Sequence, residues 1–480
     1  MVRDVIDRIS INDFDLILIP GFVQWDTSSL EKRCSIKIRK GPEFASDLPM
    51  ILKNLTKIDL SFTIPANRLF EISGKKEYED IINMQLKNAK QNISNHTFYI
   101  NEQKSKVIIG RDLPPPIIAE IVNCPEKSDK NILKKVGHYI ESGADIVDIG
   151  CVANKMYPKR IKQIIKLIRS NFDVLISIDS MEPKEILAAV DEGIDLILSF
   201  DMGNFNELCT IPKEIPIVIL PTNIKEAYFP KEPEIRVKNL LDLTQKLKKF
   251  GFKKLIADPL LETPISPGIS NSLEAYFLYK KEVKKDDNKD LELPLFFGIS
   301  NVVELMDIDS VGINGLLASI AIELDVGVLF TVEHSVKLMG GVKELKESIK
   351  LNYLSKFKKT PPINMGIQVF RAKGKVSQEI PEIDASDMIK VEYLDSKYTP
   401  DKKGYFKIYV DHYSKKILLL FYSITHQLIS TLTGDNAEAL GKKVIQLNLT
   451  NNIYHLNYIG RELNKAQTCL FTGKPYIQDA

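Results

Sequence analysis

Acidic and amide side chains follow three short apolar runs that lie far apart in the sequence. Asp179 ends the segment Ser-Ile-Asp, Asp258 precedes a proline, and Asn301 ends the segment Phe-Gly-Ile-Ser-Asn. If these runs are parallel strands of one barrel, their carboxyl ends share a rim and the three side chains meet in one pocket. Such a pocket suits a small ligand that is rich in N–H donors.

A pterin is one such ligand, because its exocyclic amine and its ring N3–H form a two-donor fork. A single carboxylate accepts both bonds, and charge-assisted bonds of this kind are stronger than neutral ones. A second acid or amide serves the other ring nitrogens, and removing such a buried partner costs roughly 1–3 kcal/mol. A purine or a sugar fits the same side chains, so the residue types alone leave the ligand open.

The elements that must position these residues alternate between apolar runs and helical patterns from residue 114 to about 350. The runs are apolar throughout, as expected of strands that are covered on both faces. Eight strand–helix units of this length match a (β/α)8 TIM barrel. The predicted strands are 117–122, 146–149, 174–178, 196–200, 217–220, 255–257, 295–297 and 326–330.

The rest of the chain predicts smaller units on both sides of the barrel, so the expected fold class is α/β with a central barrel. We expect an N-terminal α/β domain, a pterin-binding barrel, a linker with one strand, and a C-terminal α+β module. These occupy residues 1–105, 112–355, 356–395 (strand 368–371) and 396–480. In the last module we expect one strand pair, 405–410 with 417–422, and helices at 437–448 and 458–471.

The composition is that of an ordinary globular protein, with 480 residues, 44% of them hydrophobic. A net charge of +2 gives no general attraction to nucleic acid or to an anionic membrane. No apolar run approaches the ~20 residues of a membrane helix, and the start lacks a signal-peptide segment. The 5 cysteines are scattered and the 6 histidines dispersed, so we expect a cytoplasmic protein without a metal site.

Several motifs at the predicted strand ends resemble those of the pterin-binding superfamily of dihydropteroate synthases and methyltetrahydrofolate methyltransferases. Residues 143–150 are similar to the Ala-Asp-Ile-Ile-Asp-Ile-Gly strand of that superfamily, and residues 177–180 to its Val-Asp-Thr strand. Asp258-Pro259 resembles its Asp-Pro-Gly segment. With the further runs 40–42 and 458–463, the whole chain resembles the archaeal dihydropteroate-synthase-related proteins, which attach extra modules at both ends.

This resemblance implies roles for individual residues. Asp258 takes the amine and N3–H fork, Asp179 contacts the pterin ring, and Asp148 lies at the pocket floor or orders its neighbours. Ser199 stands where the family usually has a pterin-contacting Asn. Asn123 falls near an Asn that, in the synthases, helps to hold the pyrophosphate and magnesium.

Two motifs depart from the synthase pattern. The synthases end their seventh strand with Gly-x-Ser-Arg-Lys, where this chain has Asn301 and no lysine. They end the eighth with Arg-Val-His, where this chain has Thr331, Val332, Glu333 and His334. Pyrophosphate departure develops negative charge that cations must stabilise. Two such cations are missing, Glu333 adds a negative charge, and His334, displaced by one position, compensates weakly.

The segment around Asn301 instead resembles the Gly-x-Ser-Asn of pterin methyltransferases, whose Asn bonds near N5 of the reduced pterin. Methyl departure from N5 needs hydrogen bonding or protonation there, which an amide assists. The resemblance therefore favours one-carbon transfer from a tetrahydromethanopterin or tetrahydrofolate type of pterin in archaeal metabolism, with Asn301 and Asp179 as catalytic residues. By analogy the methyl acceptor is a corrinoid protein, and barrels of this family often form homodimers.

Two other functions remain open from the sequence. One is synthase chemistry, the condensation of a hydroxymethylpterin pyrophosphate with an aryl amine, which requires magnesium and a cation such as Lys337. The other is a pterin-holding module without catalysis. Structural roles also remain open, with Asp179 and Asn301 as helix caps, Asp258 as a strand terminator and Cys151 as a small buried thiol.

Overall fold

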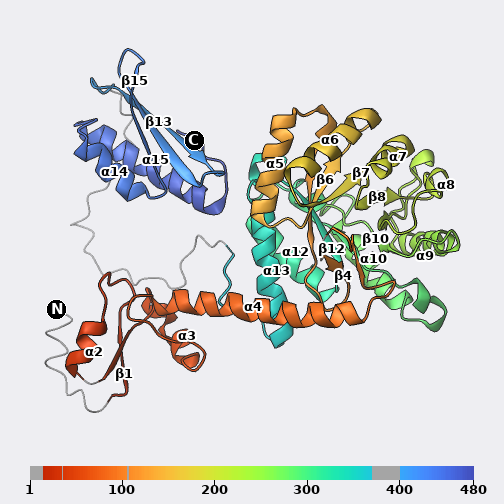
Figure 1. Cartoon of the computed structure of the whole chain (residues 1–480), viewed down its shortest axis with the longest axis horizontal. Helices are drawn as coiled ribbons and strands as arrows, with labels where there is room; N and C mark the ends of the chain where they lie inside the picture. The colour runs from red at the N-terminus through yellow and green to blue at the C-terminus, as the bar shows by residue number, and fades with distance from the viewer. Residues whose placement is uncertain (1–13, 35, 105–106, 370–399, 480) are drawn as a thin grey trace.

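The structure is a computed structural model that describes residues 14–34, 36–104, 107–369 and 400–479. Figure 1 shows a central barrel, a long N-terminal helix that runs along it, and a separate C-terminal module. The strand expected at 368–371 and most of the linker fall in the part of the chain outside these ranges.

Eight parallel strands form the barrel, in the order β10-β9-β8-β7-β6-β5-β12-β11. A parallel bridge between Ala257 and Leu295 joins the two ends of this sheet and closes it. The predicted central (β/α)8 barrel is therefore confirmed. The strands are β5 (Ile117–Ile121), β6 (Ile146–Gly150), β7 (Leu175–Asp179), β8 (Leu196–Phe200), β9 (Ile217–Ile219), β10 (Leu255–Ala257), β11 (Phe296–Gly298) and β12 (Val328–Val332).

Helices follow the strands and form the outer layer of the barrel (Figure 1). The first, α5, begins where the Ser128 side chain accepts a hydrogen bond from the backbone N–H of Asn131, and it ends at Gly143 in the left-handed region. The others are α6 (Pro158–Asn171), α7 (Pro183–Asp191), α8 (Phe205–Leu208), α9 (Pro233–Lys249), α10 (Ile269–Glu282), α11 (Ser300–Val303), α12 (Ser310–Glu323) and α13 (Gly341–Lys358), with α5 at Asp129–Ser142.

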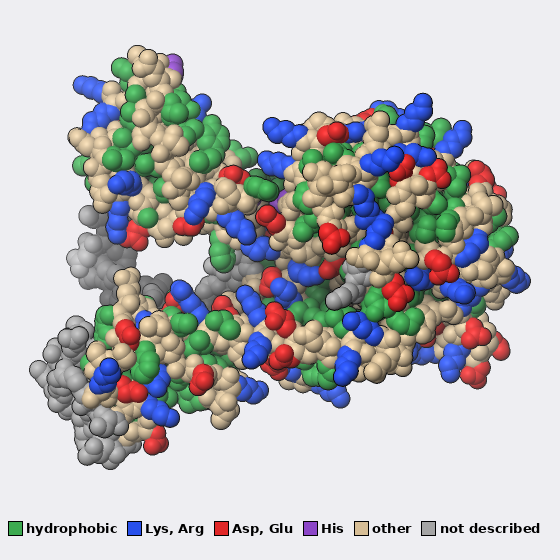
Figure 2. Space-filling model, viewed as in Figure 1, with side chains coloured by type: hydrophobic (Ala, Val, Ile, Leu, Met, Phe, Trp, Pro, Cys, Tyr) green, Lys and Arg blue, Asp and Glu red, His purple; other side chains and the backbone are tan. Residues whose placement is uncertain are grey.

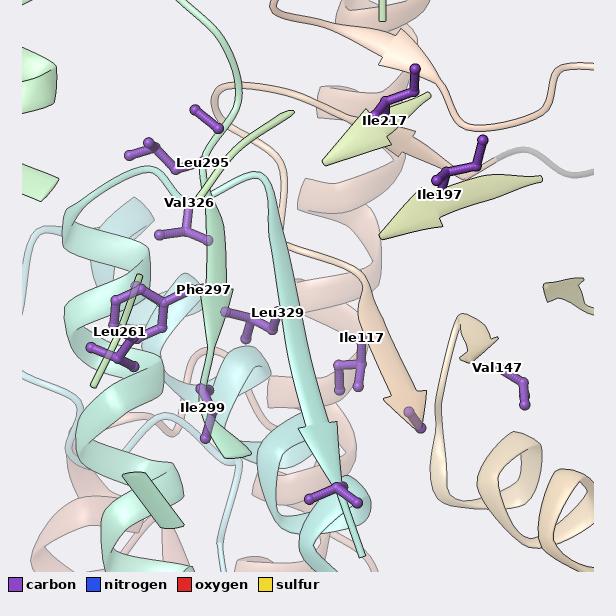
Figure 3. Close-up of a cluster of buried hydrophobic side chains, with 14 of the residues drawn as sticks. Ile117, Val147, Ile197, Ile217, Leu261, Leu295, Phe297, Ile299, Val326 and Leu329 are labelled. Atoms are coloured by element: carbon purple, nitrogen blue, oxygen red, sulfur yellow. The ribbon is translucent and has the colours of Figure 1, made fainter. Parts of the chain in front are cut away.

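Side chains alternate between the inside and the outside of the barrel along each strand, as the two-residue period of a strand requires. Ile117 and Ala119 of β5 belong to the large core between the strands and the helices, whereas Ile118 belongs to a separate interior cluster. Figure 3 shows part of the outer core, where Phe297, Ile299 and Leu329 lie close together. Both faces are apolar at this level, which explains why the strands read as continuous apolar runs.

A short hairpin fills the lower end of the barrel interior. Its strands, β3 (Phe98–Tyr99) and β4 (Ile108–Ile109), pair antiparallel, and Phe98, Ile100 and Ile109 join the interior cluster. The hairpin thus fills the interior at the amino ends of the strands, where it excludes water. A polar pocket inside this barrel has room only at the carboxyl ends of the strands.

The N-terminal region combines a small sheet with one long helix. The parallel strands β1 (Leu16–Ile19) and β2 (Lys37–Lys40) accompany α2 (Ser28–Cys34), the turn η2 (Ala45–Asp47) and α3 (Leu48–Lys53). In the sequence, apolar residues at helical spacing span 77–89. The helix α4 (Ala66–Gln91) begins well before them, directly after Pro65. It packs on the barrel through an edge-on contact of Tyr78 with Tyr353 and an ion pair of Glu77 with Lys358.

The C-terminal module has three antiparallel strands, β13 (Tyr405–Asp411), β14 (Lys416–Tyr422) and β15 (Leu428–Gly434), and two helices, α14 (Ala437–Gln446) and α15 (Ile453–Thr472). The expected α+β class is confirmed. The sequence missed β15 because none of its side chains is fully buried. Lys474 connects the module to the barrel, with its Nζ 2.8 Å from Glu344 Oε1 and 2.6 Å from Ser310 Oγ.

Acidic and basic side chains are interspersed over the face of the molecule in Figure 2. Among the helices of the described ranges, none is long and apolar enough to cross a membrane.

Candidate functional site

Three carboxylates from adjacent strands meet inside the barrel mouth. Glu120 of β5 pairs in register with Asp148 of β6, which pairs with Ser177 of β7. Asp179 follows Ser177 by two positions and therefore shares its inward face. One oxygen from each of Glu120, Asp148 and Asp179 lies within 4.8 Å of the other two. The interior of the barrel is therefore apolar along most of its length and becomes acidic in the last three residues of these strands.

Asp148 is the deepest of these acids, with no solvent-exposed surface. Its Oδ1 accepts a 2.6 Å hydrogen bond from the Ser177 hydroxyl, while its buried Oδ2 has no hydrogen-bond partner among the described residues. Burial, together with the neighbouring Asp179 and Glu120, raises the pKa of Asp148 well above its ordinary value. Asp148 is therefore a buried acid whose second oxygen has no partner among the described residues.

The two neighbours of Asp148 also resist ionisation. Burial raises the pKa of Glu120 to about 8, with Asp179 and Glu304 adding to the effect, and burial raises that of Asp179 to about 6. The Glu120 carboxylate occupies the space beside Gly150, where any added side chain would collide with it. The Asp-Ile-Gly sequence of β6 therefore supplies one acid and the room for another.

Asp258 stands at the end of β10 and is 7% exposed. Its Oδ1 accepts hydrogen bonds from the Leu260 backbone N–H at 2.8 Å and from the Tyr276 hydroxyl at 3.2 Å. Burial raises the pKa of Asp258 to about 7, partly opposed by Arg236, while Asp179 pushes it further up. Asp179 ends β7 and Asp258 directly follows β10, so both acids lie at the carboxyl end of the same barrel. The Tyr276 hydroxyl also donates to the Phe296 carbonyl at 2.7 Å, and no hydrogen bond from a described residue reaches Oδ2 of Asp258.

A fully buried arginine holds the loop that carries Asp258. Arg236 of α9 donates to the carbonyls of Leu260 at 3.0 Å and Pro230 at 2.9 Å, and it pairs with Glu262. Leu260 has a φ of 69°, a left-handed conformation that costs free energy for a side chain of this size. The loop after β10 is therefore pinned in a specific shape around Asp258.

The other three predicted residues lie at or near the same rim but differ in exposure. Asn301, at the start of α11, is exposed, and its amide donates to the carbonyl of Leu261 in the Asp258 loop at 3.0 Å. Ser199 is 6% exposed, and its carbonyl accepts a bond from the Asn204 amide at 3.0 Å. Asn123 is exposed and precedes the turn η3 (Cys124–Glu126) in the left-handed region.

Glu333, the acid that the sequence places at the end of the eighth strand, has partners of its own. Its carboxylate is 2.7 Å from Nε2 of His138 and 3.6 Å from Nζ of Lys135, and it accepts a 3.0 Å bond from the backbone N–H of Val342. These partners lower its pKa despite burial. Glu333 links α5, the end of β12 and the first turn of α13, and its charge is compensated there.

Other residues singled out in the sequence have contacts of their own. Lys337 bonds to the carbonyl of Met306 and lies 3.7 Å from Asp307. His334 is exposed, beside a cavity between α5 and the C-terminal module. Cys151 is half-buried, and burial beside Glu185 raises the pKa of its thiol, so this cysteine is no activated nucleophile.

Sequence reasoning missed Glu120, Arg236 and Tyr276. A single acid in the apolar run Ile-Ile-Ala-Glu-Ile was the available clue for Glu120, because an unpaired acid in a doubly covered strand needs an explanation. The other two residues lie on helices, where nothing in the sequence distinguishes them from neighbouring residues.

Comparison with known proteins identifies the family of this chain. The pterin binding enzyme family matches residues 123–312, and the family PterinBD-DUF4346 matches residues 400–479. The fold and the family match together define a pterin-binding barrel of the dihydropteroate synthase type. The chain is also 34% identical over 469 residues to "Uncharacterized protein MJ0107" of Methanocaldococcus jannaschii, covering 97% of this chain and 87% of that protein. It belongs to the archaeal dihydropteroate-synthase-related family that includes this protein.

More distant relatives cover the barrel. A dihydropteroate synthase of Streptococcus pyogenes is 28% identical over 111 residues, or 21% of this chain and 42% of that enzyme. Among solved structures, the Yersinia pestis dihydropteroate synthase with a pterine–sulfa conjugate has a TM-score of 0.42 and 15% identity, covering 55% of this chain and 99% of that one. The Xanthomonas albilineans enzyme in complex with 7,8-dihydropteroate has a TM-score of 0.41 and 15% identity, covering 54% and 98%.

Proposed function

We propose that this protein is a transferase that moves a methyl or other one-carbon group from a reduced pterin. The observation that carries this proposal is the charge of the barrel mouth. No Lys or Arg of the described ranges forms an ion pair with Asp148, Asp179 or Asp258, and Arg236 is already bonded to carbonyls and to Glu262. At the two strand ends where the synthases carry cations, the chain has Asn301 and Thr331, so the side chains that stabilise a departing pyrophosphate are missing there.

The acids fit the recognition part of this function. Asp258 offers Oδ2 to the amine and N3–H fork of the pterin, and Asp179 reaches the ring from the adjoining part of the mouth. A tetrahydropterin presents mostly N–H donors along its edges, so acceptor-only side chains match it better than cations do. Ser199 and Asp148 line the deeper side of the same pocket under this proposal, and Asn123 lies near its edge.

The chemical step follows from the bonds involved. A nucleophile attacks the methyl carbon, the C–N5 bond breaks, and its electron pair returns to N5, which takes up a proton. Asn301 and Asp179 are the polar groups at the rim that we assign to hold N5 and its proton. By analogy with pterin methyltransferases, the acceptor is a corrinoid protein.

Two assays on the full chain test this proposal. The first follows loss of the methyl group from an N5-methylated tetrahydropterin in the presence of cob(I)alamin, which a chemical reductant keeps in the nucleophilic Co(I) state. The second follows condensation of a hydroxymethylpterin pyrophosphate with a labelled aryl amine, with and without magnesium. We expect the wild-type chain to turn over in the first assay and Asn301→Ala to show no turnover there. Turnover in the second assay alone would overturn the proposal in favour of synthase chemistry, and tight pterin binding without turnover in either would favour a non-catalytic module.

A further inference from the structure

The acidic layer of the barrel mouth has no cationic partner among the described residues, so nothing there balances the charge of its carboxylates when they ionise. Glu120, Asp148 and Asp179 converge from three neighbouring strands, and none of them forms an ion pair with a Lys, Arg or His that the structure describes. Two carboxylates about 4 Å apart repel each other by roughly 4 kcal/mol even at an effective dielectric constant near 20. The cluster therefore requires positive charge from protons or from a bound cation.

Asp148 supplies an independent indication that something binds there. The side chain is fully buried, its Oδ1 is bonded to Ser177, and its Oδ2 has no partner. Buried polar atoms nearly always have a hydrogen-bond partner, and an exception calls for an absent ligand, ion or water. This orphan oxygen belongs to the residue at the centre of the three acids, between β5 and β7.

We propose that the carboxylates of Glu120, Asp148 and Asp179 bind one divalent hard cation, Mg²⁺ or Mn²⁺. The cluster offers only carboxylate oxygen, which these cations prefer, and it includes neither cysteine nor histidine, which zinc prefers. Adjacent oxygens around an octahedral Mg²⁺ lie about 3 Å apart. Oxygen atoms within 4.8 Å of one another would therefore draw together by up to about 2 Å around a common ion. Three protein ligands leave about three positions of an octahedral shell for water or substrate oxygen.

This site is new relative to the proposed function and does not depend on it. The sequence predicted no metal, and the magnesium of the synthase alternative was expected near Asn123 rather than on these acids. A cation bound to these acids supplies positive charge at a mouth where the synthase cation positions hold Asn301 and Thr331. Metal dependence of the two assays above therefore bears directly on which leaving group the pocket accepts.

Titration of Mn²⁺ into the metal-stripped full chain tests the proposal, with free Mn²⁺ followed by electron paramagnetic resonance and no pterin present. We expect one site per chain, competed by Mg²⁺, and at least tenfold weaker binding in Asp148→Asn. Glu120→Gln serves as the second variant, and its thermal unfolding is compared with that of wild type to show that it is folded.

Asp258→Asn is the matched control, because it removes a neighbouring mouth acid outside the cluster. It is expected to bind Mn²⁺ as wild type does while losing affinity for a tetrahydropterin. Absence of a stoichiometric site in the wild-type chain overturns the proposal, as does Mn²⁺ binding that Asp148→Asn and Glu120→Gln leave unchanged. Both of these results concern Mn²⁺ binding measured without pterin. Failure of the metal proposal is therefore distinguished from failure of the proposed pterin-dependent function.

Discussion

Asp195 and Asp148 are both buried carboxylates of the barrel, but they have opposite surroundings. Asp195, just before β8, pairs with Arg169 and with Lys104 at 3.1 Å, and it accepts bonds from the Asn101 amide at 2.7 Å and the Ile176 backbone N–H at 2.9 Å. Asp148 has the Ser177 hydroxyl and no cation. Glu333 resembles Asp195, whereas Glu120, Asp179 and Asp258 resemble Asp148.

This difference separates structural acids from candidate functional ones. Around Asp195 and Glu333 the chain provides cationic side chains and a backbone donor. No described cation forms an ion pair with Glu120, Asp148, Asp179 or Asp258, and burial raises the pKa values of these four acids. Strongly perturbed carboxylates that share a cleft mark a ligand site, because the missing partners are supplied on binding.

The largest expected effect is on stability, at the compensated acid. Asp195→Ala leaves Arg169 without its partner and removes an acceptor for the Ile176 N–H, so we expect the free energy of unfolding to fall by about 3–5 kcal/mol. Urea denaturation measures this change. The control Asp191→Ala removes an exposed acid that pairs with Lys162, and it is expected to change stability by less than about 1 kcal/mol. If both variants lowered the free energy of unfolding equally, Asp195 would not be the structurally important acid that its partners indicate.

The next effect is on ligand affinity, at an uncompensated acid. Asp258→Asn replaces an acceptor-only group with an amide that turns a donor toward the pterin fork, so we expect about 10- to 100-fold weaker binding. Fluorescence titration with a tetrahydropterin measures it, and unfolding in urea is expected to change little. Unchanged affinity would exclude Asp258 from the site.

The pH dependence of pterin binding sharpens the same comparison. Because the fork bonds to the ionised carboxylate and burial raises the pKa of Asp258 to about 7, affinity is expected to rise with pH. The ionised fraction predicts about tenfold tighter binding at pH 8 than at pH 6. The titration is repeated with Asp258→Asn, in which this slope is expected to disappear. A slope that persists in the variant would assign the pH dependence to another group.

The smallest effect is on the stability of a variant at an uncompensated acid, where the change is expected to have the opposite sign to that of Asp195→Ala or to be zero. Asp148→Asn removes a charge that the fold does not compensate, so in the absence of metal we expect stability at pH 8 to stay the same or to rise by about 1 kcal/mol. Ser177 keeps an acceptor in the variant. A loss comparable to that of Asp195→Ala would mean that Asp148 has a structural partner and would contradict the account.

The sequence predicted the barrel strands closely because each is covered on both faces and therefore reads as an apolar run between turns. Asp179 and Asp258 stand out because they end such runs. Glu120 lies inside its apolar run rather than at the end of it. Its place beside Asp148 depends on the register of β5 with β6, which the sequence does not give. Whether a buried acid is compensated also depends on partners distant in sequence, such as Lys104 for Asp195 and His138 for Glu333.

Two other features had no clear pattern to follow. The strand β15 pairs through its backbone while its side chains stay largely exposed, so hydrophobic alternation does not identify it. The first turns of α4 precede the helical spacing, and Ile72 within them is exposed on the surface.

A crystal structure of the full chain with a bound tetrahydropterin tests the central claim most directly. The account predicts the pterin at the carboxyl ends of the strands, with the Asp258 carboxylate bonded to the 2-amino and N3–H groups and Asp179 in contact with the ring. A pterin bound elsewhere, or one at the mouth whose N–H edge turns away from both acids, would contradict it.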